Sequence, residues 1–105
     1  MLRIGGENIS PFEVEDFLRR HPKVNQVAVI GVPDRRLREV VMVFIQLKED
    51  VDCSEREIIE YCRGKIANFK IPKYVKFVKN FARTGSGKIQ KFKLEEIATK
   101  ELDLD

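Results

Sequence analysis

The chain is poor in the residues from which metal centres and nucleophilic triads are usually built. Its 105 residues include one histidine, His21, and two cysteines, Cys53 and Cys62. The cysteines lie nine positions apart without a neighbouring Cys or His cluster, so we expect neither a metal site nor a required disulfide. His21 stands beside Pro22 at the expected end of a helix, and nothing near it in the sequence supplies a nucleophile or a metal ligand. We therefore expect His21 to be a capping or surface residue.

Long apolar runs are also missing. The two longest, 27–32 and 40–45, have the length of strands and are far too short to cross a bilayer. The N-terminus lacks the layout of a signal peptide, so we expect a cytoplasmic protein without a transmembrane segment. With 43% hydrophobic and 35% charged residues, and no repeat or low-complexity tract, the composition is typical of one folded domain with a modest core.

Acidic residues are missing from one long stretch. Residues 63–93 include ten Lys or Arg and no Asp or Glu, whereas the remainder has ten cations against seventeen anions. The net charge of +3 therefore conceals a basic block joined to an acidic body. Such asymmetry favours an anionic partner, for example a polyphosphate, a nucleic acid or an acidic surface. The other interpretation is that lysines such as Lys73 and Lys76 only solvate alternate positions of a strand.

Two segments carry the residues that start helices. Ser10, Pro11 and Glu13 match an N-cap, a first helical position and a capping box, which predicts a helix that ends near residues 20–21. Ser54 with Glu57 forms a second capping box and predicts a helix that continues to about residue 65. The side chains expected to face inward are Val14, Phe17 and Leu18 in the first helix and Ile58, Ile59 and Cys62 in the second.

The remaining pattern predicts three strands and a last helix. The strands are expected at 24–32, 40–47 and 74–78, and the helix over 91–100, with Phe92, Leu94 and Ile97 facing inward. The residues before position 9 are long enough only for a turn or small hairpin around Gly5 and Gly6. The order of elements predicts a compact α+β domain: a small, mostly three-stranded sheet with helices packed on it.

A glycine-rich segment, residues 83–91 with the sequence RTGSGKIQK, is the most informative part of the chain. Gly85 and Gly87 permit backbone conformations with positive φ and a close approach to a ligand. Lys88 adds a mobile point charge with three hydrogen-bond donors, which suits a phosphate or carboxylate oxygen. The spacing does not fit a Walker-type phosphate loop. A solvated turn is the other interpretation of this segment.

Four segments together resemble the C-terminal domain of AMP-forming acyl-CoA synthetases, in the adenylate-forming superfamily. They are GGENISPFEVE at 5–15, the run from His21-Pro22 to Pro33-Asp34, FKIPK at 69–73 and RTGSGKI at 83–89. The resemblance covers essentially all of the chain. It implies that residues 1–105 form a single lid domain of such a ligase, whose large N-terminal domain and hinge lie outside the sequence.

The resemblance also implies a two-step reaction and its reactants. A carboxylic acid and ATP with Mg²⁺ would form an acyl-adenylate, and coenzyme A would then displace AMP. The carboxylic acid is expected to be a fatty acid or a related acid. The lid domain alone is expected to be inactive. ATP and coenzyme A would be bound mainly by the N-terminal domain, which is the expected partner. The sequence leaves the acyl-chain length open, and a carrier protein could replace coenzyme A.

The resemblance assigns the catalytic role to Lys88, which would bridge the attacking carboxylate and the α-phosphate of the nucleotide. In a second pose of the lid, Gly5, Gly6 and Glu7 would line the tunnel for the pantetheine arm of coenzyme A. Asn8 would lie near the nucleotide, and Arg63 would contact coenzyme A. Apart from the resemblance, residues 5–7 fit a turn leading into a capped helix, and Arg63 fits a solvated helix face.

Two other functions remain open at this stage. The chain could be a free-standing basic module that binds RNA or another polyanion through residues 63–93, although no nucleic acid is expected if the resemblance holds. It could also be an interaction domain whose lysines are acetylated. Acetylation of Lys88 would delete the charge that the ligase chemistry requires.

Overall fold

The computed structural model describes residues 2–4, 7–34, 38–81, 85, 87 and 89–101. Its helices are α1 (Pro11–Arg19), α2 (Glu55–Cys62) and α3 (Lys91–Glu101), with a short 3₁₀ helix, η1 (Asn68–Lys70). Its strands are β1 (Leu2–Ile4), β2 (Glu7–Ile9), β3 (Val24–Asp34), β4 (Arg38–Leu47) and β5 (Tyr74–Phe77). From α1 onward the predicted order of helix, strand, strand, helix, strand, helix is confirmed. The strands β3 and β4 are longer than predicted, and α2 ends three residues earlier.

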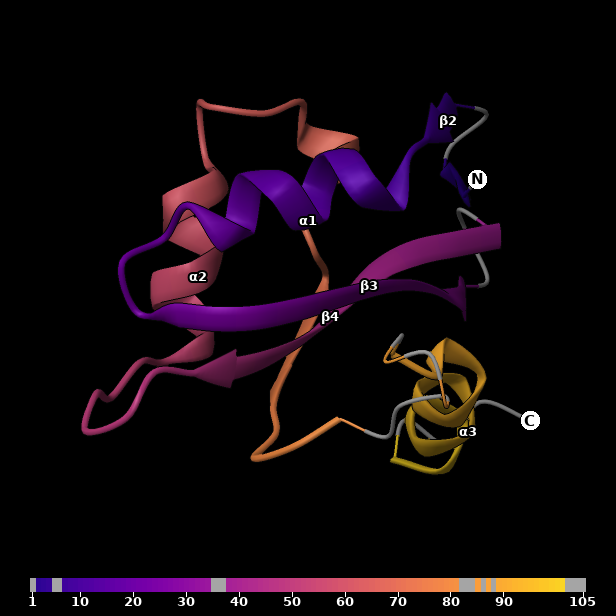
Figure 1. Ribbon diagram of the computed structural model, residues 1–105. Helices are drawn as coiled ribbons and strands as arrows, with labels where there is room; N and C mark the ends of the chain where they lie inside the picture. The colour runs from indigo at the N-terminus through magenta and orange to yellow at the C-terminus, as the bar shows by residue number, and fades with distance from the viewer. Residues whose placement is uncertain are drawn as a thin grey trace.

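A three-stranded sheet in the order β3-β4-β5 is the centre of the fold. β3 and β4 pair antiparallel, and β4 and β5 pair parallel. Figure 1 shows α1 and α2 on one side of this sheet and α3 on the other. The predicted α+β class with a small three-stranded sheet is therefore confirmed, and helices cover both of its faces.

Burial on both faces explains the continuous apolar runs of β3 and β4. Alternate side chains of a strand point to opposite faces, so a strand covered on both sides needs apolar residues at every position. Val27 and Val29 lie in the cluster shared with α1 and α2, whereas Ala28 and Ile30 lie in the cluster shared with α3. We call these the first and second clusters. The second cluster consists of Ala28, Ile30, Val32, Val40, Met42, Phe44, Leu94 and Ala98.

The inward face of α3 differs from the prediction. Phe92 is 57% exposed and Ile97 39% exposed, so the expectation that both face the core is wrong. Leu94 was predicted correctly, and its buried partner is Ala98, one turn further along the helix. Leu94 and Ala98 have the i, i+4 spacing of one helix face, and a small residue at position 98 lets the helix pack closely on the sheet.

The N-terminal residues form the predicted small hairpin. β1 and β2 pair antiparallel, with Arg3 opposite Asn8 and Ile4 opposite Glu7. Gly5 and Gly6, where the turn was predicted, lie outside the described residues. Ile9 at the end of β2 is fully buried in the first cluster, which ties the hairpin to α1.

The two predicted helix caps differ in the structure. The Ser54 hydroxyl accepts a hydrogen bond from the backbone N–H of Glu57 at 3.1 Å, as expected for an N-cap. Ser10 occupies the N-cap position of α1, but its side chain makes no capping hydrogen bond. Pro11 supplies no N–H at the first helical position and Glu13 donates its N–H to the Ser10 carbonyl at 3.2 Å, which reduces the demand for a side-chain cap.

Within the part of the chain that the structure describes, none of the helices is both long enough and apolar enough to span a bilayer.

The difference between the caps predicts different costs of substitution. Ser54→Ala should lower the free energy of unfolding by about 1 kcal/mol, because it leaves the Glu57 N–H without its acceptor. Ser10→Ala should cost less than about 0.5 kcal/mol, since no capping bond is lost. Urea denaturation followed by far-UV circular dichroism measures both, and equal costs would contradict this account of the caps.

Candidate functional site

Described residues at both ends of the glycine-rich segment contact the second cluster. Phe81, just before the segment, and Ile89, near its end, both pack partly buried against this cluster. Gly87 has a φ of +87°, a value that L side chains rarely adopt, so the glycine permits the backbone to turn there. Lys88 lies between Gly87 and Ile89 in the chain, outside the described residues. The structure therefore defines the residues on either side of the predicted catalytic lysine.

A surface hollow of about 600 Å³ adjoins this segment. It is bounded by α1, β3 and the start of α3, so the N-terminal half of the chain meets the start of the last helix beside Gly87. Both signs of charge and an exposed aromatic ring line it: Phe12, Glu15, Arg19, Gln26, Val27, Gly87, Ile89 and Lys91. Among the residues that the structure describes, Phe12 is the most exposed large apolar side chain.

The other predicted ligand residues lie elsewhere or outside the described set. Glu7 and Asn8 belong to β2, so their backbones sit in the N-terminal hairpin and not at the glycine-rich segment. Gly5 and Gly6 lie outside the described residues. The roles assigned to these four residues stay predictions.

Arg63 follows α2 at its C-cap position and points to solvent. Its side chain is 66% exposed, and its guanidinium forms an ion pair with Glu60 at 3.2 Å. This environment is that of the solvated helix end. A role in contacting coenzyme A stays a prediction.

Tertiary structure brings acids to several cations of the basic block. Lys70 pairs with Glu13 on α1 at 2.6 Å, and Lys76 pairs with Glu101 on α3 at 2.7 Å. Lys91 pairs with Glu15 at 2.9 Å. Residues 63–93 contain no acid, and the acids that pair with these lysines come from other segments of the chain. These pairs reduce the positive charge that a polyanion would meet, which weakens the alternative of a nucleic-acid module.

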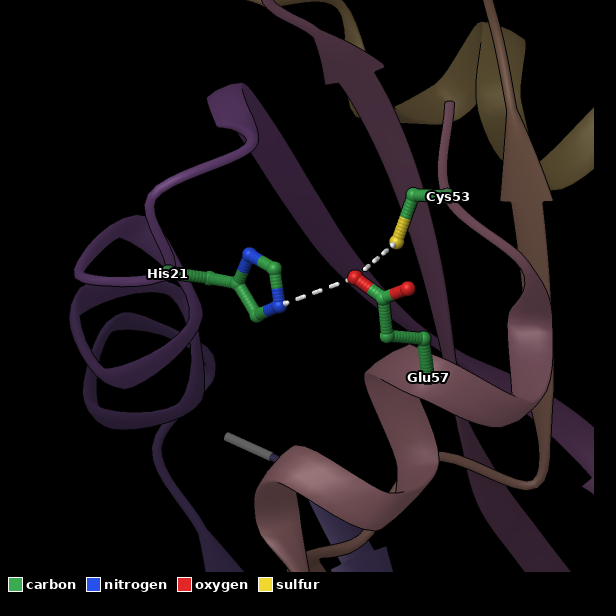
Figure 2. Close-up of side chains that lie close together, drawn as sticks. All are labelled: His21, Cys53 and Glu57. Carbon is green, nitrogen blue, oxygen red and sulfur yellow. Dashed lines mark hydrogen bonds and ion pairs between the residues drawn. The ribbon is translucent and has the colours of Figure 1, made fainter. Parts of the chain in front are cut away.

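A second group of reactive side chains, distant from the glycine-rich segment in the sequence, is shown in Figure 2. His21 follows α1, Cys53 precedes α2, and Glu57 lies in the first turn of α2. Their potential ligand atoms all lie within 4.8 Å of one another. Glu57 Oε2 is 3.7 Å from His21 Nε2 and 3.4 Å from Cys53 Sγ. Lys23 completes the group, with its ammonium 3.1 Å from the same carboxylate oxygen.

The structure corrects the prediction for His21. Its ring is buried, with 6% relative exposure, and packs edge-on against Tyr61 at 4.7 Å between ring centroids. The expectations of a surface or capping position, and of no potential metal ligand nearby, are both wrong. The sequence pattern did not indicate this group, because its members come from two segments, 21–23 and 53–57, that only the fold brings together.

Protonation in this group favours a hydrogen-bonded network over a metal centre. The backbone N–H of Lys23 donates to His21 Nδ1 at 3.1 Å, which leaves the proton of the neutral ring on Nε2, facing Glu57. Burial and the hydrogen bond to Glu57 raise the pKa of Cys53 to about 11, so the thiol stays protonated at neutral pH. The hydrogen bond from Lys23 is the main reason why the pKa of Glu57 is lowered. A metal ion bound here would have to displace the proton on His21 Nε2, the proton of the Cys53 thiol and the Lys23 ammonium.

The second cysteine is equally unreactive. Cys62 is fully buried in the first cluster, and burial raises its pKa to about 11. Both thiols are free in the structure, as the sequence predicted. Neither has the lowered pKa of a nucleophilic cysteine.

Comparison with known proteins gives three consistent similarities. The family model described as "AMP-binding enzyme C-terminal domain" matches residues 13–88. A curated relative, the human mitochondrial medium-chain acyl-CoA ligase ACSF2, is 51% identical over 104 residues, which cover 99% of this chain and 17% of the relative. The fatty acyl CoA synthetase of Mycobacterium tuberculosis has a TM-score of 0.87 and 37% identity over 96% of this chain and 20% of its own.

A further solved structure contains an acyl-adenylate. It is the anthranilate CoA ligase AuaEII in complex with anthranoyl-AMP, with a TM-score of 0.87 and 40% identity over 99% of this chain and 21% of that chain. In each case the chain spans about a fifth of the length of the protein that it matches.

The environment of His21 predicts a loss of stability in mild acid. Burial is the main cause that lowers its pKa below the ordinary value of 6.5. As the pH falls below 6.5, the unfolded chain therefore binds a proton that the native state does not bind, and the free energy of unfolding decreases. The decrease from one such group cannot exceed about 1.4 kcal/mol per pH unit.

His21→Asn should remove most of this dependence, because the amide oxygen of Asn can still accept the Lys23 N–H but does not titrate. The measurement is urea denaturation at about pH 8 and about pH 5.5. Both values lie above the pH range in which the lowered pKa of Glu57 changes the free energy of unfolding. The same loss of stability in both proteins would contradict the assignment to His21.

Proposed function

Because the chain belongs to the family of AMP-binding enzyme C-terminal domains, we propose that it is the C-terminal lid domain of an AMP-forming acyl-CoA ligase. The family match, which runs from Glu13 to Lys88 and so includes the predicted catalytic lysine, carries this proposal. Similarity to ligases that are named for CoA, one of them holding an acyl-adenylate, supports it. The whole domain, residues 1–105, would then act together with a large N-terminal domain.

The proposed reaction has two steps. In the first, a carboxylate oxygen of the acid attacks the α-phosphorus of Mg-ATP, and pyrophosphate leaves with the electrons of the broken P–O bond. In the second, the thiol of coenzyme A releases its proton to the solvent and its sulfur attacks the acyl carbonyl, and AMP leaves with the electrons of the broken acyl–oxygen bond. The products are an acyl-CoA, AMP and pyrophosphate. ATP, Mg²⁺ and coenzyme A would be held mainly by the N-terminal domain.

Lys88 would act by electrostatic stabilisation in the first step. The reacting carboxylate and the α-phosphate are both anions, and they repel each other as they approach. An ammonium group placed between them offsets this repulsion and stabilises the charge that develops on the phosphate oxygens in the transition state. The carboxylate is already ionised at neutral pH and is itself the nucleophile, so the lysine is not needed as a base.

The second step would use the N-terminal hairpin of the domain. A backbone turn without side chains at Gly5 and Gly6 would allow the pantetheine arm to pass closely, with Glu7 at the mouth of the tunnel. Asn8 would lie near the nucleotide, and Arg63 would contact coenzyme A. A cytoplasmic location stays a prediction.

Substitution of the lysine tests the proposal. In the complete ligase that carries this domain, Lys88→Ala should reduce adenylate formation about 100- to 1,000-fold, because one preorganised cation is lost from the transition state. The measurement is pyrophosphate release with saturating acid and ATP. Conversion of a supplied acyl-adenylate to acyl-CoA should be largely unchanged, since the second step does not use this contact.

Lys79→Ala is the matched control, because Lys79 is an exposed lysine of the same basic block. It should leave both steps unchanged. Pyrophosphate release by Lys88→Ala at the rate of the unmodified enzyme would refute the proposed role of Lys88.

A further inference from the structure

Glu15 is the most deeply buried charged residue in the part of the chain that the structure describes. It lies on α1, faces the sheet and is only 5% exposed. Its Oε2 atom accepts the backbone N–H of Val29 at 2.8 Å. Val29 belongs to β3, which is an edge strand of the sheet, so the carboxylate occupies a position where a neighbouring strand would otherwise bind.

The same oxygen atom binds the first residue of α3. Lys91 Nζ lies 2.9 Å from Glu15 Oε2, and the ammonium also lies 5.7 Å from the centre of the Phe12 ring. One carboxylate thus joins α1, β3 and the start of α3. Lys91 follows Lys88 by three residues and is the last residue of the glycine-rich segment, so this contact fixes the C-terminal end of that segment.

Two features of this pair are unfavourable for stability alone. Glu15 is buried although the Lys91 side chain is 36% exposed, so the carboxylate loses hydration that offsets part of its attraction to the ammonium. Lys91 is also placed in the first turn of α3, where the helix dipole favours anions, and that turn contains no acidic residue. For the stability of α3 alone, an acidic residue would suit position 91 better than a lysine.

We propose that Glu15 is a positioning residue that acts through Lys91 to hold the C-terminal end of the glycine-rich segment for the adenylation step. This inference rests on the proposed role of Lys88. Apolar contacts of Phe81 and Ile89 with the second cluster hold the ends of the segment onto the sheet, but they are not directional. The charged hydrogen bond between Glu15 and Lys91 sets a direction and a length, which is what an electrostatic contact to a reacting phosphate requires.

Three single variants of the complete ligase test this inference. Lys91→Met keeps most of the aliphatic stem and removes the charge, and Glu15→Gln keeps an acceptor for the Val29 N–H and removes the opposite charge. Each should slow adenylate formation about 10- to 100-fold, as expected for a small displacement of a catalytic group. The KM for ATP and the conversion of a supplied acyl-adenylate should stay unchanged. Lys91→Arg should recover most of the rate, because it restores the ion pair.

Lys93→Met is the matched control, since Lys93 is an exposed lysine of the same helix turn. It should leave the rate of adenylate formation unchanged. The double variant Glu15→Gln/Lys91→Met should be no slower than the slower single variant, because both act through one contact. Thermal unfolding of all variants separates the loss of rate from any loss of fold.

Three results would overturn the inference. The first is an equal loss in both reaction steps, which would indicate a structural role only. The second is a raised KM for ATP in Lys91→Met with Glu15→Gln unaffected, which would mean that Lys91 contacts the nucleotide directly. The third is full adenylation activity in both single variants while Lys88→Ala is inactive. Full activity of Lys88→Ala itself would instead refute the proposed role of Lys88, on which this inference rests.

Discussion

Burial of β3 and β4 on both faces is the constraint on which the rest of the structure depends. The first cluster binds α1 and α2 to one face of these strands, and the second cluster binds α3 to the other. Because side chains alternate along a strand, the paired residues of β3 and β4 supply side chains to both clusters. The position of α3, and therefore of the glycine-rich segment that precedes it, is set by apolar packing on the face opposite to α1.

That arrangement creates a problem that apolar packing cannot solve. In the proposed mechanism the glycine-rich segment presents a cation with fixed geometry, yet Gly85 and Gly87 are exposed, and Gly87 has a conformation that only glycine adopts readily. Glu15 extends from α1 at the edge strand and reaches Lys91 at the start of α3. A charged contact thus joins elements that pack on opposite faces of the sheet. This contact lies beside the hollow that Phe12 and Gly87 line.

Much of the fold could be predicted from local pattern. The cap at Ser54, the helix start at Ser10 and Pro11, and the strand-length apolar runs all concern neighbours in the chain. These predictions hold apart from the missing side-chain cap at Ser10 and small shifts of the ends. The inward face of α3 was predicted less well. Phe92 and Ile97 have the larger apolar side chains, but the axial rotation of the helix is set by its fit to β3 and β4, which places Leu94 and Ala98 inward. The periodicity of apolar residues in α3 therefore does not predict which of its faces packs on the sheet.

By itself the sequence determined the element types, the α+β class, the glycine-rich segment with Lys88 and the resemblance to one family, because each depends on residues close together or on motif order. Only the tertiary structure decided which charges are neutralised and which polar side chains meet. The acids that pair with Lys70, Lys76 and Lys91 come from other segments, and so do the partners of His21. Electrostatic contacts act over a few ångströms in space, and the chain brings those atoms together only after its apolar surfaces have packed.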